Sequence, residues 1–201
     1  MNPTRGVVLA GGRSRRMGED KASIVLNGRT LLERSVTLLR ALDLPVTVCA
    51  RREQVLPDSG FARVDDPEPG IGPVGGLLAA MTACPGESLL VIAVDLPRLE
   101  VYTLDRLLDQ RDPAYAVTAY RSPGDTRVEP LCAIYEPAAE SFIRAAVAAG
   151  RHSLRQILED SGRLRMIEAA HPHQLIDLDT PGALANLISR SDPTMPCQPS
   201  T

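Results

Sequence analysis

The sequence predicts one α/β domain of three layers, in which helices cover both faces of a mostly parallel β-sheet. Short apolar runs of strand length alternate with segments whose apolar residues recur at helical spacing, as expected for βαβ units. Leu89–Val94 is a continuous apolar run between Ser88 and Pro97, which is typical of a central strand buried on both faces. The length of 201 residues, with 44% hydrophobic and 23% charged residues, suits a single globular domain.

The individual elements follow from period and punctuation along the chain. Strands are expected at Gly6–Ala10, Val46–Ala50, Phe61–Val64, Leu89–Val94, Tyr115–Tyr120 and Leu131–Tyr135, with weaker candidates at Arg165–Ile167 and Gln174–Asp177. Helices are expected at Leu31–Leu42, from Pro73 onward, at Val101–Leu108, Ala138–Ala149 and Leu154–Leu158, and after Pro181. The Pro- and Ser-rich end predicts a domain over residues 1–189 and a disordered tail over 190–201.

Composition excludes several classes of function. A formal net charge of −3 argues against a protein that coats a polyanion, and two Phe, four Tyr and no Trp leave no stacking platform for single-stranded nucleic acid. The longest apolar stretch falls far short of the roughly 20 residues that a membrane-spanning helix needs. We therefore expect neither a nucleic-acid partner nor a membrane span.

The N-terminal segment and the cysteines indicate a cytoplasmic chain without structural metal. The first apolar run is too short for a signal peptide and leads into an arginine cluster. The cysteines stand at wide spacings without a C-x-x-C pair, so neither a zinc site nor a disulfide framework is expected. They are Cys49, Cys84, Cys132 and Cys197.

Three polar clusters follow predicted strands, where ligands bind in open parallel sheets. The first is LAGGRSRRMGEDK, in which Gly11 and Gly12 can let backbone N–H groups approach a polyphosphate. Four cations lie within this segment, namely Arg13, Arg15, Arg16 and Lys21. It matches neither the P-loop nor the dinucleotide glycine pattern. Without further information, a tight turn followed by solvated arginines explains this cluster equally well.

The second cluster, DDPEPGIGPVGGL, joins a pair of carboxylates to a glycine-rich helix start. Gly75 and Gly76 lower helix propensity in the first turn, so their lack of a side chain has another cause. That cause is either a ligand or backbone that passes close by, or tight packing of the helix on the sheet.

The third cluster places Asp95 directly after the most apolar strand. A carboxylate there is costly to bury unless a cation meets it. Mg²⁺ is a suitable cation, since it typically uses one or two carboxylates and completes its shell with water and phosphate oxygens. The alternative is that Asp95 caps a helix beginning near Pro97.

Taken in order and with their spacing, these motifs resemble the molybdenum cofactor guanylyltransferases, a family of MobA-like nucleotidyltransferases with a glycosyltransferase-A-like fold. The matching segments are LAGG-R-S-R-RMG-x-DK, D-x-x-x-x-x-GPVGGL, VDLP, EPLCAIYEP and AGRHSLRQIL, which extend the resemblance over roughly residues 7–187. The resemblance implies the Rossmann-like fold of nucleotide-diphospho-sugar transferases.

The resemblance also implies roles for particular residues. It makes Lys21 a phosphate ligand and Asp95 the Mg²⁺ carboxylate, with both residues also contacting the nucleotide and serving catalysis. Asp66, with Asp65 as the alternative, contacts the nucleotide. The nucleotide-contacting turn consists of Leu9, Ala10, Gly11 and Gly12.

Two departures from the family pattern affect the residue roles that the resemblance implies. Where the family often has an asparagine after the second strand, this chain has Cys-Ala-Arg-Arg, and Arg51 is a candidate substitute. The sequence DLDTPG over 177–182 replaces an N-x-N-T-P-E-like stretch, which can alter the pterin side.

The implied reaction transfers GMP from GTP to the terminal phosphate of molybdenum-molybdopterin and releases pyrophosphate. One alternative is a related enzyme that uses CTP or another phosphorylated acceptor. A second is a non-catalytic nucleotide-binding partner of a molybdoenzyme or its chaperone. Glu129 is either functional or a turn residue, and the segment with Arg151, His152 and Arg155 either touches the pterin phosphate or is a solvated helix start.

Overall fold

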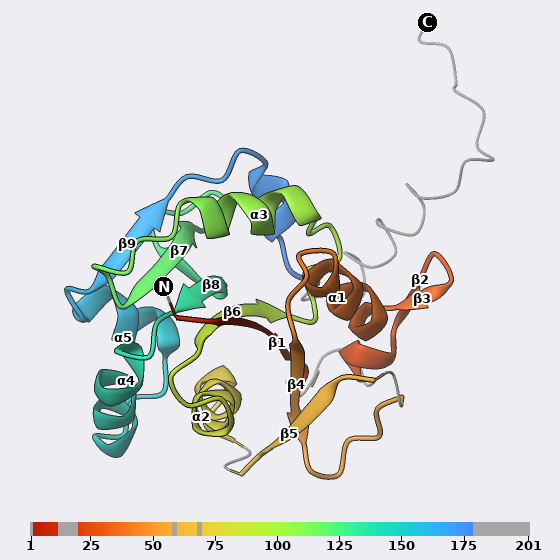
Figure 1. Cartoon of the computed structure of the whole chain (residues 1–201), viewed down its shortest axis with the longest axis horizontal. Coiled ribbons are helices and arrows are strands. Elements are labelled where there is room, and N and C mark those ends of the chain that lie inside the picture. The colour runs from red at the N-terminus through yellow and green to blue at the C-terminus, as the bar shows by residue number, and fades with distance from the viewer. Residues whose placement is uncertain (1, 12–19, 58–59, 68–69, 179–201) are drawn as a thin grey trace, which may run out of the picture.

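The computed structural model describes residues 2–11, 20–57, 60–67 and 70–178. Its central feature is a seven-stranded sheet in the order β5-β4-β1-β6-β8-β7-β9 (Figure 1). All neighbouring strands are parallel except that β8 runs antiparallel to both β6 and β7. The strands are β1 (Thr4–Leu9), β4 (Val46–Arg51), β5 (Ala62–Asp66), β6 (Ser88–Ala93), β7 (Val117–Arg121), β8 (Val128–Tyr135) and β9 (Leu164–Ile167).

Helices cover both faces of this sheet, as predicted. Helices α1 and α3 lie on one face and α2, α4 and α5 on the other (Figure 1). Their bounds are α1 (Leu31–Arg40), α2 (Pro73–Ala83), α3 (Val101–Asp109), α4 (Ala139–Ala148) and α5 (Leu154–Asp160). A reciprocal pair of hydrogen bonds between Thr30 and Glu33 caps the start of α1, and Pro73 supplies the first residue of α2.

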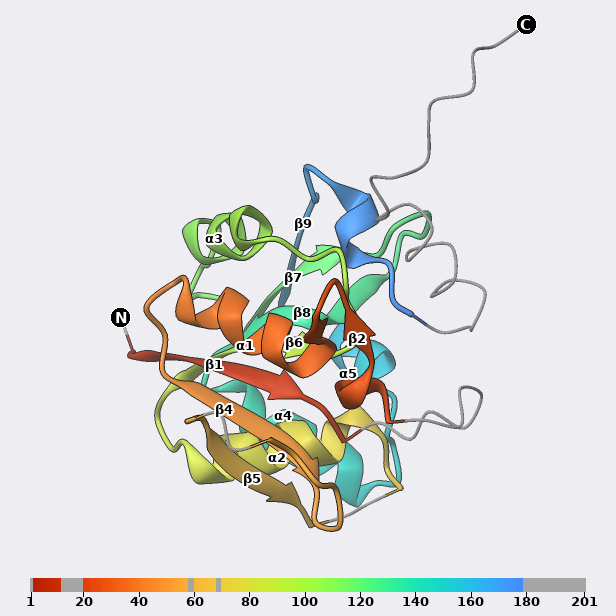
Figure 2. The same cartoon turned by 90° about the vertical axis from the view of Figure 1, so that its right-hand side faces the viewer.

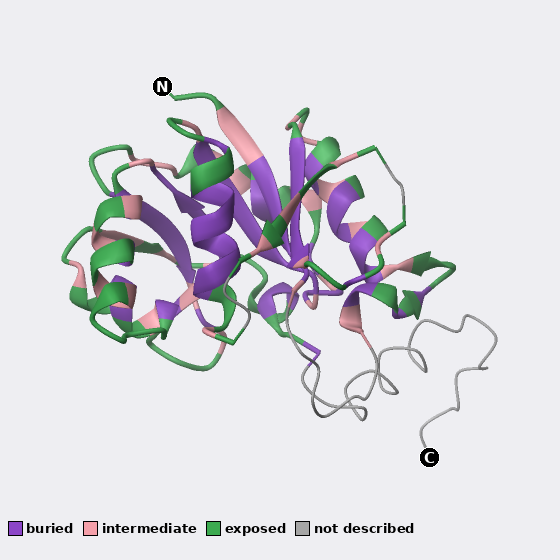
Figure 3. Ribbon diagram, turned by 90° about the horizontal axis from the view of Figure 1, so that it is seen from below, coloured by how far each residue is buried: buried purple, intermediate pink, exposed green. Residues whose placement is uncertain are grey.

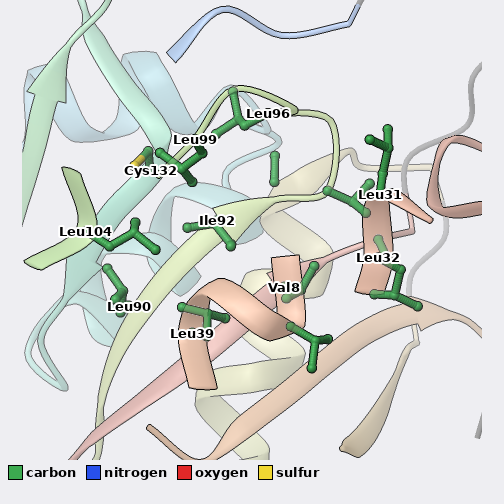
Figure 4. Packing of buried hydrophobic residues seen from close by; sticks show 14 of the residues in the cluster. Val8, Leu31, Leu32, Leu39, Leu90, Ile92, Leu96, Leu99, Leu104 and Cys132 are labelled. Atoms are coloured by element: carbon green, nitrogen blue, oxygen red, sulfur yellow. The ribbon is translucent and has the colours of Figure 1, made fainter. Parts of the chain in front are cut away.

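Alternate residues of the central strands feed two hydrophobic clusters, one on each face of the sheet. In β6, Leu90 and Ile92 face α1 and α3, whereas Leu89 and Val91 face α2. Figure 4 shows the first cluster, in which Leu39 of α1 lies near the sheet residues. Buried residues run along the central strands and along α2, which is apolar all round (Figure 3).

The strand order places a topological switch point between β1 and β6. From β1 the chain proceeds outward to β4 and β5, then returns through α2 to pair β6 with the other edge of β1 (Figure 2). The carboxyl ends of β1 and β6 therefore lie side by side. Ligands of doubly wound sheets bind outside the carboxyl ends of strands at such a point.

Some expected elements differ from the structure. The strand expected at Gln174–Asp177 is wrong, because Pro172–Leu175 forms a 3₁₀ helix, η2, in which Gln174 N donates to His171 O. Strand β8 begins at Val128, three residues before the expected start at Leu131. Two small elements were not predicted from the sequence, namely a 3₁₀ helix, η1 (Lys21–Ser23), and a hairpin of β2 (Val25–Leu26) and β3 (Arg29–Thr30).

The helix expected after Pro181 and the boundary at residue 189 lie outside the described residues. The domain limits therefore stay a prediction.

Candidate active site

Lys21 and Asp95 meet at the switch point of the sheet. Lys21 begins η1, whose N-cap Asp20 accepts a hydrogen bond from Ala22 N, and Asp95 follows β6. Lys21 Nζ lies 2.7 Å from Asp95 Oδ2, with the two side chains 14% and 19% exposed. The structure thus brings together one residue each from the first and third predicted clusters.

The alternative role of Asp95 as a helix cap is wrong. Helix α3 begins only at Val101, and its N-cap residue is Glu100, whose side chain makes no capping hydrogen bond. The backbone of Asp95 is held as well, since Leu178 N donates to its carbonyl oxygen at 3.0 Å. The side chain and the backbone of Asp95 are therefore both held in place next to β1.

The end of β1 is held from both neighbouring strands. On the β6 side, Val94 N donates to Leu9 O at 3.2 Å, and on the β4 side Ala10 N donates to Cys49 O at 2.8 Å. The described part of the predicted nucleotide-contacting turn ends at Gly11. Gly12 and the three arginines at 13, 15 and 16 lie outside the described residues.

Asp66 lies against the first turn of α2, and this explains one of the two glycines there. A Cβ built on Gly75 would lie only 2.8 Å from Asp66 Oδ1, so a side chain at residue 75 would push the carboxylate away. For Gly76 the nearest atoms are Leu9 Cδ2 at 3.3 Å and Cys49 Cβ at 3.6 Å. The packing explanation therefore holds for Gly76, whereas Gly75 leaves space for a carboxylate at a helix N-terminus.

The neighbouring Asp65 has a different environment. It is exposed on the edge strand β5, where its Oδ1 accepts from Arg63 Nε at 2.8 Å. Alternation along the strand gives Asp65 and Asp66 opposite directions, and Asp66 is the one that faces α2.

Arg51 braces the backbone at the end of β1. Its Nη1 donates to Gly11 O at 2.8 Å, and its Nη2 lies 3.4 Å from Asp20 Oδ2, with the Arg51 side chain 16% exposed. Gln54, which the sequence analysis did not single out, donates from Nε2 to Ala10 O at 3.1 Å. A polar residue inside a short turn has no periodic pattern that would mark it as buried.

A second polar group gathers near the ends of β7 and β8. Glu129 Oε1 accepts from Leu131 N at 3.0 Å, and its Oε2 lies 3.3 Å from Ser122 Oγ and 3.9 Å from Arg155 Nη2. Burial raises the pKa of the Glu129 carboxyl, and the charge of Asp177 acts in the same direction, against the lowering effects of the Leu131 amide and Arg155.

An open pocket of about 450 Å³ adjoins this group and is lined mainly by residues 121–126, with Glu168, Ala169 and Pro172. Arg151 is exposed and forms an ion pair with Asp160, whereas the half-buried Arg155 donates from Nη2 to Ser122 Oγ at 3.2 Å.

The described cysteines are buried free thiols. Burial raises the pKa of Cys49 to about 12, and it raises the pKa values of Cys84 and Cys132 as well. These side chains are neutral at pH 7 and pack as small apolar groups. Cys197 lies outside the described residues.

The donor set suits a hard cation that binds through few protein ligands. Within residues 2–11, 20–57, 60–67 and 70–178, no three His, Cys, Asp or Glu side chains are arranged to hold a metal ion. Mg²⁺ needs no such cage, since one carboxylate together with water and substrate phosphates completes its octahedral shell. Asp95, a carboxylate already facing a cation at the switch point, fits this mode of binding.

A doubly wound sheet with charged side chains at its switch point is typical of nucleotide-binding α/β proteins. Residues 6–170 match the family described as "MobA-like NTP transferase domain". The chain belongs to this MobA-like nucleotidyltransferase family.

Curated relatives carry names from the same family. One is 37% identical over 174 residues, covering 83% of this chain and 85% of its own, and is named "Probable molybdenum cofactor guanylyltransferase" from Mycobacterium tuberculosis. A "Molybdenum cofactor guanylyltransferase" from Xanthomonas euvesicatoria is 32% identical and covers 92% of this chain and 95% of its own. Both relatives match over most of their length.

Solved structures show the same fold. Molybdopterin-guanine dinucleotide biosynthesis protein A from Archaeoglobus fulgidus is similar with a TM-score of 0.76 at 21% identity, covering 92% of this chain and 97% of its own. The 2-C-methyl-D-erythritol 4-phosphate cytidylyltransferase from Thermus thermophilus gives a TM-score of 0.71 at 17% identity, with the same coverage of 92% and 97%. At these identities the likeness establishes the fold. Among the described residues, no helix has the length and apolar character to cross a membrane.

Proposed function

We propose that this protein transfers GMP from GTP to the terminal phosphate of molybdenum-molybdopterin, releasing pyrophosphate and forming molybdopterin guanine dinucleotide. The observation that carries the proposal is the Lys21–Asp95 pair at the switch point, in a chain whose curated relatives are named molybdenum cofactor guanylyltransferases. A lysine and a carboxylate at this position supply what a triphosphate with a divalent cation needs.

The proposed roles of the residues follow from their positions. Lys21 binds a phosphate of GTP, and the turn from Leu9 to Gly12 contacts the nucleotide through its backbone. Asp66 contacts the nucleotide from the end of β5, beside the first turn of α2. Asp95 would hold Mg²⁺, which would neutralise charge on the triphosphate when bound. These assignments place all catalytic side chains on the carboxyl edge of the sheet.

The chemistry requires no nucleophile from the protein. A phosphate oxygen of molybdopterin forms a bond to the α-phosphorus of GTP while the bond from that phosphorus to the oxygen bridging to the β-phosphate breaks. The electron pair leaves with pyrophosphate. A phosphate monoester is already ionised at neutral pH, so the chain contributes alignment and charge stabilisation rather than a general base. The neutral buried thiols are consistent with this mechanism.

Pyrophosphate release tests the proposal directly. GTP and CTP are each incubated with Mg²⁺, with and without molybdenum-loaded molybdopterin, and Asp95→Asn serves as the control for the site. Release that requires both GTP and the pterin supports the proposal. Preference for CTP would change the product. Nucleotide binding without release under any of these conditions would contradict the proposal and leave either another phosphorylated acceptor or a non-catalytic nucleotide-binding partner of a molybdoenzyme.

A further inference from the structure

The turn that follows β4 holds two successive carbonyl groups at the end of β1. Gln54 Nε2 donates to Ala10 O at 3.1 Å, and Arg51 Nη1 donates to Gly11 O at 2.8 Å. Gln54 is 4% exposed, although it is a polar side chain in a short loop. Burying a side-chain amide is costly unless its polar atoms are hydrogen-bonded. The buried position of Gln54 therefore depends on the hydrogen bonds that its side chain makes.

Both polar atoms of the Gln54 side chain are used. Its Oε1 accepts from Arg51 N at 3.2 Å while its Nε2 donates to Ala10, so the side chain bridges its own turn and β1. Arg63 of β5 fixes the turn from the other side. Its guanidinium donates to the carbonyl oxygens of Gln54, Arg51 and Arg52 at 2.9, 2.9 and 3.0 Å. The turn is therefore a rigid support rather than a free loop.

Fixing a carbonyl also fixes the amide on the other side of the same peptide bond. The peptide bonds of the described residues include none in the cis form, so the N–H of Gly11 points opposite to Ala10 O. Ala10 O faces the β4 side, where Gln54 lies, and the N–H of Gly11 accordingly faces the β6 side, where Asp95 follows. This is the place at which the proposed nucleotide site requires backbone donors.

We propose that Gln54 is a positioning residue for nucleotide binding, which holds the Ala10–Gly11 peptide so that the Gly11 amide faces the nucleotide, with Arg51 holding the next carbonyl. This inference rests on the proposed function. It also gives Arg51 a role different from that of a direct substitute for a base-contacting asparagine. Without the Gln54 donor, the Ala10–Gly11 peptide loses the one described hydrogen bond to its own carbonyl group, and only the neighbouring bonds of Ala10 N and Gly11 O restrain its direction.

The test compares GTP affinity among variants of Gln54 in the full chain. Gln54→Leu removes both hydrogen bonds at similar volume, and Gln54→Glu keeps the acceptor for Arg51 N while replacing the donor to Ala10 O with an oxygen. Binding of a fluorescent GTP analogue with Mg²⁺ is measured at pH 8, together with urea unfolding of each variant. We expect both variants to weaken GTP binding about tenfold, since a lost buried hydrogen bond has roughly that effect on an equilibrium.

Gln174→Leu is the matched control. Gln174 is also a buried glutamine, 2% exposed, but its Oε1 accepts from Thr103 Oγ1 at 2.5 Å, away from the end of β1. This variant is expected to lose stability while binding GTP as the wild type does. In ¹⁵N NMR spectra, the Gly11 amide resonance should shift on adding GTP in the wild type and shift much less in Gln54→Glu.

The outcomes separate the inference from the proposed function. If the wild type does not bind GTP, the proposed function fails and the inference fails with it. If the wild type binds GTP and folded Gln54→Glu binds it equally well, the inference alone is wrong. An equal loss of GTP affinity in Gln174→Leu would also overturn it, because the effect would then reflect general destabilisation.

Discussion

Replacing Lys21 with methionine should increase the affinity of the nucleotide-free protein for a divalent cation. The Lys21 ammonium lies 2.7 Å from Oδ2 of Asp95. A metal that binds this carboxylate has to displace the ammonium and also meets its positive charge. Methionine has a similar length and no charge, so both obstacles disappear in the variant.

The size of the effect follows from the burial of the pair. With side chains 14% and 19% exposed, the pair lies between a surface ion pair and a buried one, which gives a net coupling of about 1–2 kcal/mol. Since 1.4 kcal/mol corresponds to a tenfold change, Mn²⁺ should bind Lys21→Met about five- to thirtyfold more tightly. Turnover should fall by about a hundredfold or more, as expected when a charge-stabilising group is removed.

Electron paramagnetic resonance of free Mn²⁺ measures this affinity without requiring catalysis. Arg144→Met is the control, because it removes a cation from an exposed pair with Glu140 on α4 and should leave Mn²⁺ binding unchanged. Asp95→Asn should abolish the site. A Mn²⁺ affinity that stays the same or falls in Lys21→Met would refute the idea that the ammonium and the metal compete for one carboxylate.

Three further predictions concern other residues of the site. Asp95→Ala should remove pyrophosphate release from GTP and pterin, and a near-wild-type rate would rule out Asp95 as the metal ligand. Gly75→Ala should weaken GTP binding severalfold, because the new Cβ would lie 2.8 Å from Asp66 Oδ1 and displace that carboxylate. Urea unfolding should show less than about 1 kcal/mol of lost stability, because alanine favours the helix. Equal GTP affinity would separate Asp66 from the nucleotide. Burial raises the pKa of the Glu129 carboxyl above the ordinary 4.5, so the folded protein binds the proton of this carboxyl more tightly than the unfolded chain does. The wild type therefore loses stability as the pH rises through the folded-state pKa. Glu129→Gln should lack this contribution, and the stability difference between variant and wild type, measured by urea unfolding, should therefore change as the pH rises above 4.5.

Local patterns in the sequence predicted most of the fold because the buried elements carry strong signals. The continuous apolar run at Leu89–Val94 and the apolar spacing after Pro73 correspond to β6 and α2. The reversed direction of β8 depends on how strands pair, which periodicity does not report. A signal for it was present, since the connection between β7 and β8 is short and rich in turn residues, and a parallel pair needs a longer crossover.

The residues of the site likewise fall into those that the sequence predicts and those that it does not. The convergence of Lys21 and Asp95, which are 74 residues apart, was predictable because both follow strands of a parallel sheet and residues after such strands share an edge. The support from Gln54 was not predictable. Gln54 is buried inside a turn and donates a hydrogen bond to the backbone of Ala10, 44 residues away, and neither feature has a sequence pattern.

The antiparallel strand β8 sets the distance between the site that follows β6 and the pocket that follows β7. Because β8 lies between β6 and β7 and runs antiparallel to both, Asp95, two residues after β6, and Ser122, directly after β7, lie on the same edge of the sheet two strand spacings apart. With neighbouring strands about 4.8 Å apart, that separation is about 10 Å. The pocket lined by residues 121–126 therefore lies two strands away from the Lys21–Asp95 pair, along the edge of the sheet that holds both.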